Sequence, residues 1–180
     1  MINKKINDIA LTGIGIALFV VMSICLQVPV FENYYLCLGY IVMIVYIYLF
    51  GITKGIIIGV LGTFLYCIII NGIRGLPGWA IGNVFVALII SLAFHLGKKL
   101  SNKILKYTVY IMGIILGCCL GILVIKSIVE YFIYAQPIIL RMTNNIYAFI
   151  ADVVVLIAGV PICEKLEKVM NSLTKYSTNS

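Results

Sequence analysis

A succession of long apolar runs, each followed by a short polar loop, constrains this chain more than any other feature. Of its 180 residues, 63% are hydrophobic and only 11% are charged. A soluble domain of this length cannot bury so much apolar surface, whereas runs of about 17 to 25 apolar residues suit helices that cross about 30 Å of hydrocarbon. We therefore predict an all-α membrane protein, a six-transmembrane-helix bundle in which residues 1–180 form a single integral membrane domain. The spans are predicted at residues 9–27, 34–50, 55–70, 78–96, 106–131 and 147–163.

The basic residues are distributed unevenly between the two ends of the predicted bundle. Most of the 13 lie near the termini or in the loops after the second and fourth spans. Because lysines concentrate on the cytoplasmic side of membrane proteins, we expect both termini in the cytoplasm. The same rule accounts for the net charge of +7, so we expect no nucleic-acid partner. Residues 164–180 are predicted to be a solvated cytoplasmic tail with one short amphipathic helix and a fraying end. The residues on the predicted cytoplasmic side are Lys4, Lys5, Lys54, Lys98, Lys99, Lys103, Lys106, Lys165, Lys168 and Lys175.

A polar break at residues 71–83 separates the third and fourth spans. It holds Arg74, which offers a forked cation, and Trp79, the only tryptophan, which offers a stacking surface. Asn83 lies one helical turn beyond Trp79 and about 6 Å deeper in the membrane. At that depth an amide either faces a cavity or makes an interhelical hydrogen bond, and both readings stay open. We interpret this stretch as the mouth of a binding site.

The loop after the first span adds side chains suited to a planar polar ligand. Glu32 supplies a carboxylate, Asn33 an amide, and Tyr34 and Tyr35 supply flat faces with hydroxyl groups. The alternative for the two tyrosines is an aromatic belt at the membrane interface.

The last two spans carry polar residues inside apolar sequence. Asp152 lies within the sixth span, where an unpaired carboxylate costs roughly 2.5 to 3.5 kcal/mol or more, and Asn145 shares its helix face. Lys126 and Glu130 stand four residues apart near the outer end of the fifth span and could pair with each other. Together with Arg141, they place both signs of charge in the outer half, which favours a pocket for a small polar molecule.

Small residues recur at three- or four-residue spacing in three spans, and each stripe allows close helix approach. In the fifth span we expect packing inside the bundle, whereas the stripes of the first and third spans could face a partner protein. The stripes are Ala10, Gly13 and Ala17 in the first span, Gly55 and Gly59 in the third, and Gly113, Gly117 and Gly121 in the fifth.

The sequence carries no recognisable catalytic or metal-binding motif. The six cysteines form no C-x-x-C pair and are interpreted as small apolar fillers. The single histidine, His95, lies at the cytoplasmic end of the fourth span beside Lys98 and Lys99, and the sequence has no H-E-x-x-H, G-x-S-x-G or Walker-type pattern. We therefore expect that the protein is not an enzyme and binds no cofactor or metal. Any energy for transport would come from a partner protein or from a gradient.

With these features the chain resembles the S components of energy-coupling factor (ECF) transporters, which are small six-helix membrane proteins that capture vitamins or related micronutrients. The resemblance covers most of the chain. It rests on the size, the six spans, the cytoplasmic termini, the stripe of Ala10, Gly13 and Ala17, the proline-bearing first loop, and the Gly-Leu-Pro-Gly-Trp entrance to the fourth span.

The resemblance implies a substrate-capture subunit of a vitamin importer in the cell membrane, with no ATPase of its own. In that family an A-x-x-x-A pattern in the first helix contacts a transmembrane scaffold subunit, which couples to two ATPases. Here Gly13-x-x-x-Ala17 stands in its place. Ligands of the family lie on the outer side, but no signature selects among riboflavin, thiamine, folate, biotin, pantothenate, pyridoxine or another micronutrient. A membrane-embedded enzyme and a stand-alone small transporter remain the alternatives.

Overall fold

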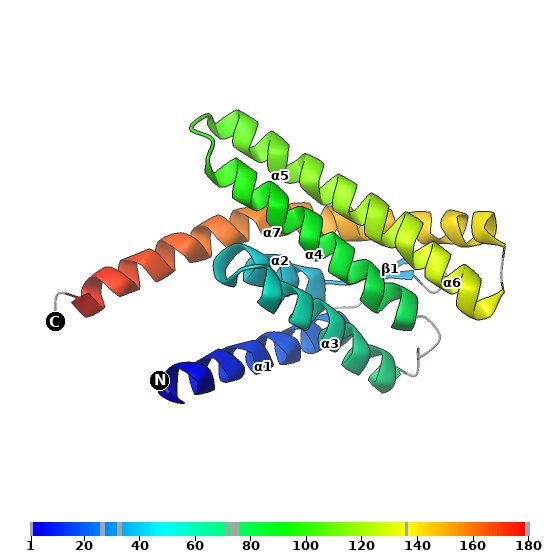
Figure 1. The fold of residues 1–180 in the computed structure, drawn as a ribbon, viewed down its shortest axis with the longest axis horizontal. Coiled ribbons are helices and arrows are strands. Elements are labelled where there is room, and N and C mark those ends of the chain that lie inside the picture. The colour runs from blue at the N-terminus through cyan, green and yellow to red at the C-terminus, as the bar shows by residue number, and fades with distance from the viewer. Residues whose placement is uncertain are drawn as a thin grey trace.

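The computed structural model describes the chain apart from residues 1, 26–27, 32–33, 71, 73–75, 136 and 179–180, and for residues 2–4, 28–31, 34–35 and 174–178 it describes the backbone alone. Within these limits the fold is a helical bundle with one small β-hairpin (Figure 1). The elements are α1 (Ile2–Cys25), β1 (Val28–Phe31), β2 (Tyr34–Leu36), α2 (Gly39–Phe50), α3 (Ile52–Ile70), α4 (Leu76–Lys98), α5 (Lys103–Cys118), the π-helical segment η2 (Cys119–Lys126), α6 (Ser127–Tyr134) and α7 (Ile138–Thr178).

Five helical stretches of the described chain are long and apolar enough to cross a membrane. One of them is the continuous run of α5, η2 and α6, from Lys103 to Tyr134. The short apolar helix α2 is the sixth helix of the bundle. These helices confirm the predicted all-helical class.

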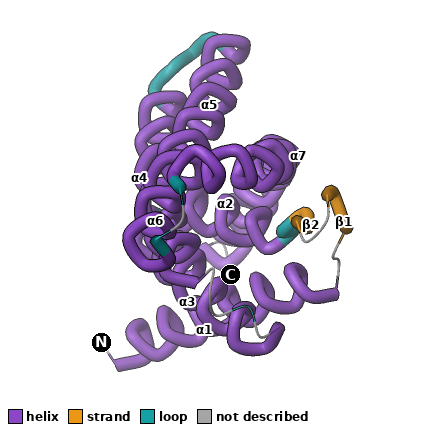
Figure 2. The backbone as a smooth tube through the Cα atoms, turned by 90° about the vertical axis from the view of Figure 1, so that its right-hand side faces the viewer, coloured by secondary structure: helices purple, strands orange, loops and turns teal. Residues whose placement is uncertain are grey.

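Helix α2 forms the centre of the bundle. Its 12 residues reach only about 18 Å, which is less than the hydrocarbon thickness. The helix is apolar on every side, as expected of a helix buried all round, and most of its residues are buried. It contacts α1, α3, α4 and α7, and Figure 2 shows it enclosed by the longer helices.

A glycine sets the reversal between α2 and α3. Gly51 adopts a φ of 92°, a left-handed conformation that glycine reaches without a Cβ clash, and its N–H donates to the carbonyl oxygen of Ile47 at 3.2 Å. Helix α3 then begins at once with Ile52. The two helices therefore lie next to each other with almost no loop between them.

Helices α4 and α5 form the closest pair in the bundle. The Asn102 side chain caps α5 by accepting the N–H of Ile104 at 2.9 Å. Further along, the glycine stripe of the predicted fifth span lies against α4. A Cβ built on Gly121 would come within 2.6 Å of the carbonyl oxygen of Gly82, and the converse is equally close. The expected internal packing of this stripe is confirmed.

The predicted second span starts too early. Residues 34–36 belong to strand β2, which pairs antiparallel with β1, with Val28 opposite Leu36 and Pro29 opposite Tyr35. The hairpin contacts α7 and lies at the side of the bundle (Figure 2). The tyrosines and β-branched residues of this stretch favour extended backbone, so the apolar run divides into a strand and a shorter helix.

The last helix is longer than the predicted last span and includes most of the predicted tail. Helix α7 begins at Ile138 and continues to Thr178, so the tail is no separate short helix. Pro161 lies inside the helix without ending it. Nor is the tail only a solvated flank, because two of its glutamates contact the bundle.

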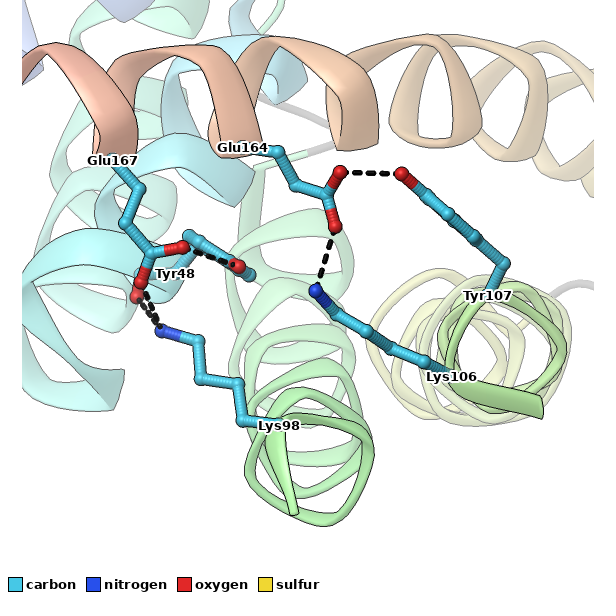
Figure 3. A network of polar contacts seen from close by, with 6 residues as sticks. All are labelled: Tyr48, Lys98, Lys106, Tyr107, Glu164 and Glu167. Carbon is cyan, nitrogen blue, oxygen red and sulfur yellow. Dashed lines mark hydrogen bonds and ion pairs between the residues drawn. The ribbon is translucent and has the colours of Figure 1, made fainter. Parts of the chain in front are cut away.

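The first of these glutamates joins α7 to α5. The Glu164 carboxylate accepts from Lys106 Nζ at 2.7 Å and from the Tyr107 hydroxyl group (Figure 3). The side chains of Glu164 and Lys106 are only 20% and 24% exposed, so the pair is partly shielded from solvent.

The second glutamate joins α7 to α2 and α4. Tyr48 donates its hydroxyl to Glu167 Oε2 at 2.8 Å, and Lys98 Nζ lies 3.5 Å from Glu167 Oε1 (Figure 3). The same ammonium donates to the Tyr48 carbonyl oxygen and lies over the Tyr48 ring. We call this end of the molecule, which also holds Lys106, the lysine-rich end.

Candidate functional site

A chain of hydrogen bonds links α2, α3 and α4 towards the end of the bundle opposite the lysine-rich end. Trp79 Nε1 donates to the Tyr40 hydroxyl oxygen at 2.7 Å, and Tyr40 donates to Asn83 Oδ1 at 2.6 Å. The Asn83 amide nitrogen donates to the carbonyl oxygen of Gly59 at 3.0 Å and to Thr63 Oγ1 at 2.8 Å. Asn83 is fully buried and makes interhelical hydrogen bonds, which is one of the two roles that the sequence left open for this amide.

Trp79 is half-buried at the start of α4. The edge-to-face contact with Tyr66, at 5.5 Å between ring centroids, and the bond to Tyr40 hold its indole ring in place. A ring fixed on two sides is a rigid wall, which is what a stacking surface for a planar ligand requires.

A second group of polar side chains lies where α6 meets α7. The Asn145 amide nitrogen donates to Ser127 Oγ at 2.9 Å and to Glu130 Oε2 at 3.4 Å. Arg141 Nη1 lies 3.8 Å from Glu130 Oε2, and its guanidinium lies over the Tyr134 ring. Ser127, Glu130 and Asn145 are buried, and we call these three residues with Arg141 the polar cluster.

The ion pair of the polar cluster differs from the one that the spacing suggested. Glu130 pairs with Arg141, and among the described residues no direct ion pair joins Glu130 to Lys126. Arg141 also keeps a buried Nε–H that has no partner within the described part of the structure. A buried donor without a partner costs free energy, so this atom is available to a ligand or a water molecule.

The start of α4 brings Trp79 towards the polar cluster. A Cβ built on Gly78 would lie 3.1 Å from Glu130 Cγ and 3.2 Å from Lys126 Cγ. Only a residue without a side chain lets α4 approach η2 and α6 so closely. The glycine that precedes the tryptophan therefore sets the distance between the two groups.

Asp152 lies deeper, on the part of α7 that faces α2 and η2. It is 5% exposed, and Tyr40 and Lys126 are among its electrostatic neighbours. Among the described residues no ion pair joins Asp152 directly to a cation. A buried carboxylate of this kind is a functional-site candidate by default because of its cost in the membrane.

The side chains of the remaining five predicted site residues are not described. Glu32, Asn33 and Arg74 lie outside the described residues. Tyr34 and Tyr35 lie in β2, of which the backbone is described, and this strand contacts α7. Four of the nine predicted residues, Trp79, Asn83, Asn145 and Asp152, are thus placed with their side chains.

Sequence reasoning missed Tyr40, Thr63 and Ser127, which connect the predicted residues. Each lies within an apolar run, where a single hydroxyl group does not distinguish a functional residue from one that only packs between helices. The signal that could have found them is general, since a hydroxyl group at membrane depth seeks a partner on a neighbouring helix.

The small-residue stripes of α1 and α3 differ in what covers them. Ala10, Gly13 and Ala17 are exposed, and a Cβ built on Gly13 would meet nothing within 4 Å. Gly55 and Gly59 are buried against side chains of α2. Of these two stripes, the one on α1 is therefore open to a partner, and the prediction that the α3 stripe could face one is wrong.

Comparison with known proteins gives a match over nearly the whole chain. A family model described as the ECF-type riboflavin transporter, S component, matches residues 3–168. Similar relatives include two UPF0397 proteins of Streptococcus thermophilus. The protein of strain LMG 18311 is 29% identical over 162 residues, covering 81% of this chain and 86% of the relative, and that of strain LMD-9 is 28% identical over 167 residues, covering 88% of each. No solved structure matches the chain. Because the family model spans all the helices, this protein belongs to the family of S components of ECF-type riboflavin transporters.

Proposed function

We propose that this S component captures riboflavin, or a flavin with the same ring system, between Trp79 and the polar cluster. S components are binding proteins for vitamin uptake and not enzymes, so the chain captures a substrate and carries out no reaction. The observation that carries the choice of flavin is the family match over residues 3–168.

The chemistry of the proposed site suits a flavin. The isoalloxazine ring is planar, and one edge alternates carbonyl acceptors with an N–H donor, so it calls for an aromatic wall and for both kinds of hydrogen-bonding partner. Trp79 supplies the wall. Glu130 and Asn145 Oδ1 would accept, and the Arg141 Nε–H, which has no partner within the described structure, would donate. The ribityl hydroxyl groups would reach towards Asp152.

Two loops complete the proposed site. Glu32, Asn33, Tyr34 and Tyr35 would close it from the hairpin side, and Arg74 from the loop before α4. Asn83 contributes indirectly, because it holds Tyr40, which in turn holds Trp79. It is a positioning residue in this proposal.

The orientation follows from the positive-inside rule. We place the lysine-rich end and both termini in the cytoplasm of the cell, so that the proposed site opens outward. Green fluorescent protein fused to the C-terminus folds only in the cytoplasm and should fluoresce. A dark fusion of normal abundance would reverse the orientation.

The family implies partners from an ECF module. We propose that these are one transmembrane scaffold subunit, which docks on the exposed stripe of Ala10, Gly13 and Ala17, and two ATPases bound to the scaffold. Tagged chain should retain all three on purification. Recovery of the chain alone from cells that contain the module, under conditions that preserve other ECF complexes, would contradict this assembly.

The substrate proposal is tested by equilibrium titration. Riboflavin fluorescence should be quenched as purified protein is added, and thiamine, biotin and pantothenate should not compete. Competition by one of these vitamins at concentrations similar to riboflavin, or no quenching at all, would contradict the proposal.

A further inference from the structure

A groove lies between the first turn of α3 and the second half of α4, away from the proposed flavin site. Its volume is about 500 Å³, within the roughly 300 to 1,000 Å³ that is typical of ligand sites. Leu88 and Leu92 are 43% and 58% exposed, so the groove opens on the outside of the bundle. The lining residues are Ile52, Leu88, Ile89, Ser91, Leu92 and His95.

The apolar part of this groove would face hydrocarbon in a bilayer. Both α3 and α4 are long and apolar enough to cross a membrane. In a bilayer an outward-facing apolar groove on such helices is filled by acyl chains. Selection of one kind of lipid then depends on the polar groups at the end of the groove.

The wall of the groove changes from apolar to basic along one stripe of α4. Leu88, Leu92 and His95 stand at positions i, i+4 and i+7, which share one face of α4, and Lys99 directly follows the end of this helix at Lys98. His95 and Lys99 are both exposed. Two other lysines near this groove already have partners, since Lys98 contacts Glu167 and the Tyr48 carbonyl oxygen, and Lys54 pairs with Asp8.

The opposite wall adds positive potential at the same end. Ile52 lines the groove and is the first residue of α3, so the helix N-terminus with its partial positive charge lies at this rim. None of the six lining residues is acidic. The positively charged end of the groove therefore matches the phosphate of a phospholipid, and its apolar part matches an acyl chain.

We propose that this groove is a binding site for an anionic phospholipid of the inner leaflet. One acyl chain lies along Leu88 and Leu92, and the phosphate lies between His95, Lys99 and the N-terminus of α3. Basic sites between helices on the cytoplasmic side recognise anionic headgroups in this way. The site is independent of the flavin proposal.

The test uses the purified full-length chain in detergent, mixed with phosphatidylglycerol and phosphatidylcholine of identical acyl chains. Native mass spectrometry should show phosphatidylglycerol retained in preference to phosphatidylcholine. The variant His95→Ala/Lys99→Ala should reduce that preference by on the order of fivefold or more, since one basic residue at a surface contributes about that factor. The matched control Lys103→Ala removes an exposed lysine outside the groove and should leave the preference unchanged.

A second pair of variants tests the acyl-chain half of the site. Leu92→Trp fills the groove and should lower retention of both lipids, whereas Leu116→Trp, at a position on α5 that is 55% exposed, should not. Leu88→Trp repeats the test from the adjacent turn in case Leu92→Trp lowers the yield of folded protein.

Three outcomes would overturn the proposal. The first is equal retention of the two lipids by the unaltered chain, and the second is retention that neither the charge variant nor the groove variants change. The third is that Leu92→Trp abolishes co-purification of other transporter subunits and leaves lipid retention intact, which would make the groove a protein contact.

Discussion

At the scale of single residues, the Tyr40 hydroxyl group is the link on which the buried hydrogen-bond chain depends. It accepts from Trp79 and donates to Asn83, so it joins α2 to α4, and Asn83 extends the network to α3. Buried polar networks of this kind rigidify a core only while every member is satisfied. A residue of α2 thus holds the single tryptophan in position, although no motif in α2 indicates a site.

Replacing Tyr40 with phenylalanine should destabilise the protein and loosen Trp79. The change keeps the ring but leaves the Trp79 N–H and Asn83 Oδ1 without partners, which costs about 1–3 kcal/mol. Thermal unfolding in detergent should therefore shift to lower temperature. Because Trp79 is the only tryptophan, its fluorescence spectrum should shift as well. Tyr131→Phe, at an exposed position on α6, is the control, and identical behaviour of the two variants would refute the link.

Asn145 is the described residue through which the polar cluster should contact the ligand. Its alanine variant should weaken flavin binding roughly tenfold, because it removes the Oδ1 acceptor offered to the ligand and leaves the buried Ser127 and Glu130 without their shared amide donor, and a loss of this kind costs about 1–3 kcal/mol. Titration of riboflavin fluorescence measures the change. Thr143→Ala is the matched control on the same helix, since its exposed hydroxyl bonds only to the carbonyl oxygen of Ile139. Equal affinities of both variants would place the ligand elsewhere.

At this scale the sequence singles out residues that are unusual in a membrane and passes over ordinary ones. Trp79, Asn145 and Asp152 stood out because an indole, an amide and a carboxylate are costly or rare within apolar runs. Tyr40 and Ser127 did not, because their role depends on which helix lies opposite them. The pairing of Glu130 with Arg141 instead of Lys126 has the same cause, since helix spacing shows only neighbours within one helix.

At the scale of elements, α1 is the helix on whose exposed small-residue face we propose that the scaffold subunit docks. Ala10, Gly13 and Ala17 are exposed, whereas Gly15 on the same helix lies against Tyr46 and Ile58. One helix therefore has an inward glycine and an outward small-residue stripe. Close backbone approach is what such a stripe permits in a bilayer.

A bulky residue in this stripe should block assembly without affecting capture. Ala17→Trp should abolish riboflavin uptake in cells and leave the affinity of the purified chain unchanged, because the side chain projects from the bundle. Leu18→Trp, at an exposed position around the helix, is the control and should transport normally. Loss of binding in Ala17→Trp would instead show that the stripe packs inside the protein.

Two ion pairs that differ in exposure and distance join α7 to the bundle at the lysine-rich end. Glu164→Gln should lower the free energy of unfolding by about 1 kcal/mol, because the Glu164 pair is partly buried and reinforced by Tyr107. Glu167→Gln should have a smaller effect, since both partners of that pair are 39% exposed and 3.5 Å apart. Denaturation in low and high salt checks the order, and a larger effect for Glu167→Gln would contradict it.

Element positions were predictable to within a few residues wherever an apolar run coincided with one helix. The hairpin and the length of α7 were not, because hydropathy records burial in lipid and not backbone shape. The π-helical segment η2 was also invisible, since it changes the hydrogen-bond register within an uninterrupted apolar run.

At the scale of the whole molecule, the bundle separates two kinds of polar surface. The lysine-rich end carries partly exposed ion pairs that tie α2, α4, α5 and α7 together (Figure 3). The other end carries buried polar groups, one of them without a partner in the described structure. The short central helix α2 reaches only part of the way across the membrane, which leaves depth for a site above it.

The most direct test of the account is mass spectrometry of small molecules extracted from the purified, folded protein. Expressed in cells that contain ordinary vitamins, the chain should release riboflavin or a close flavin in an amount approaching one molecule per protein, and Asn145→Ala should release much less. Release of an unrelated vitamin in that amount would keep the role of an S component and overturn the proposed substrate. An extract without any flavin, from protein that also fails to bind added riboflavin, would contradict the flavin site itself.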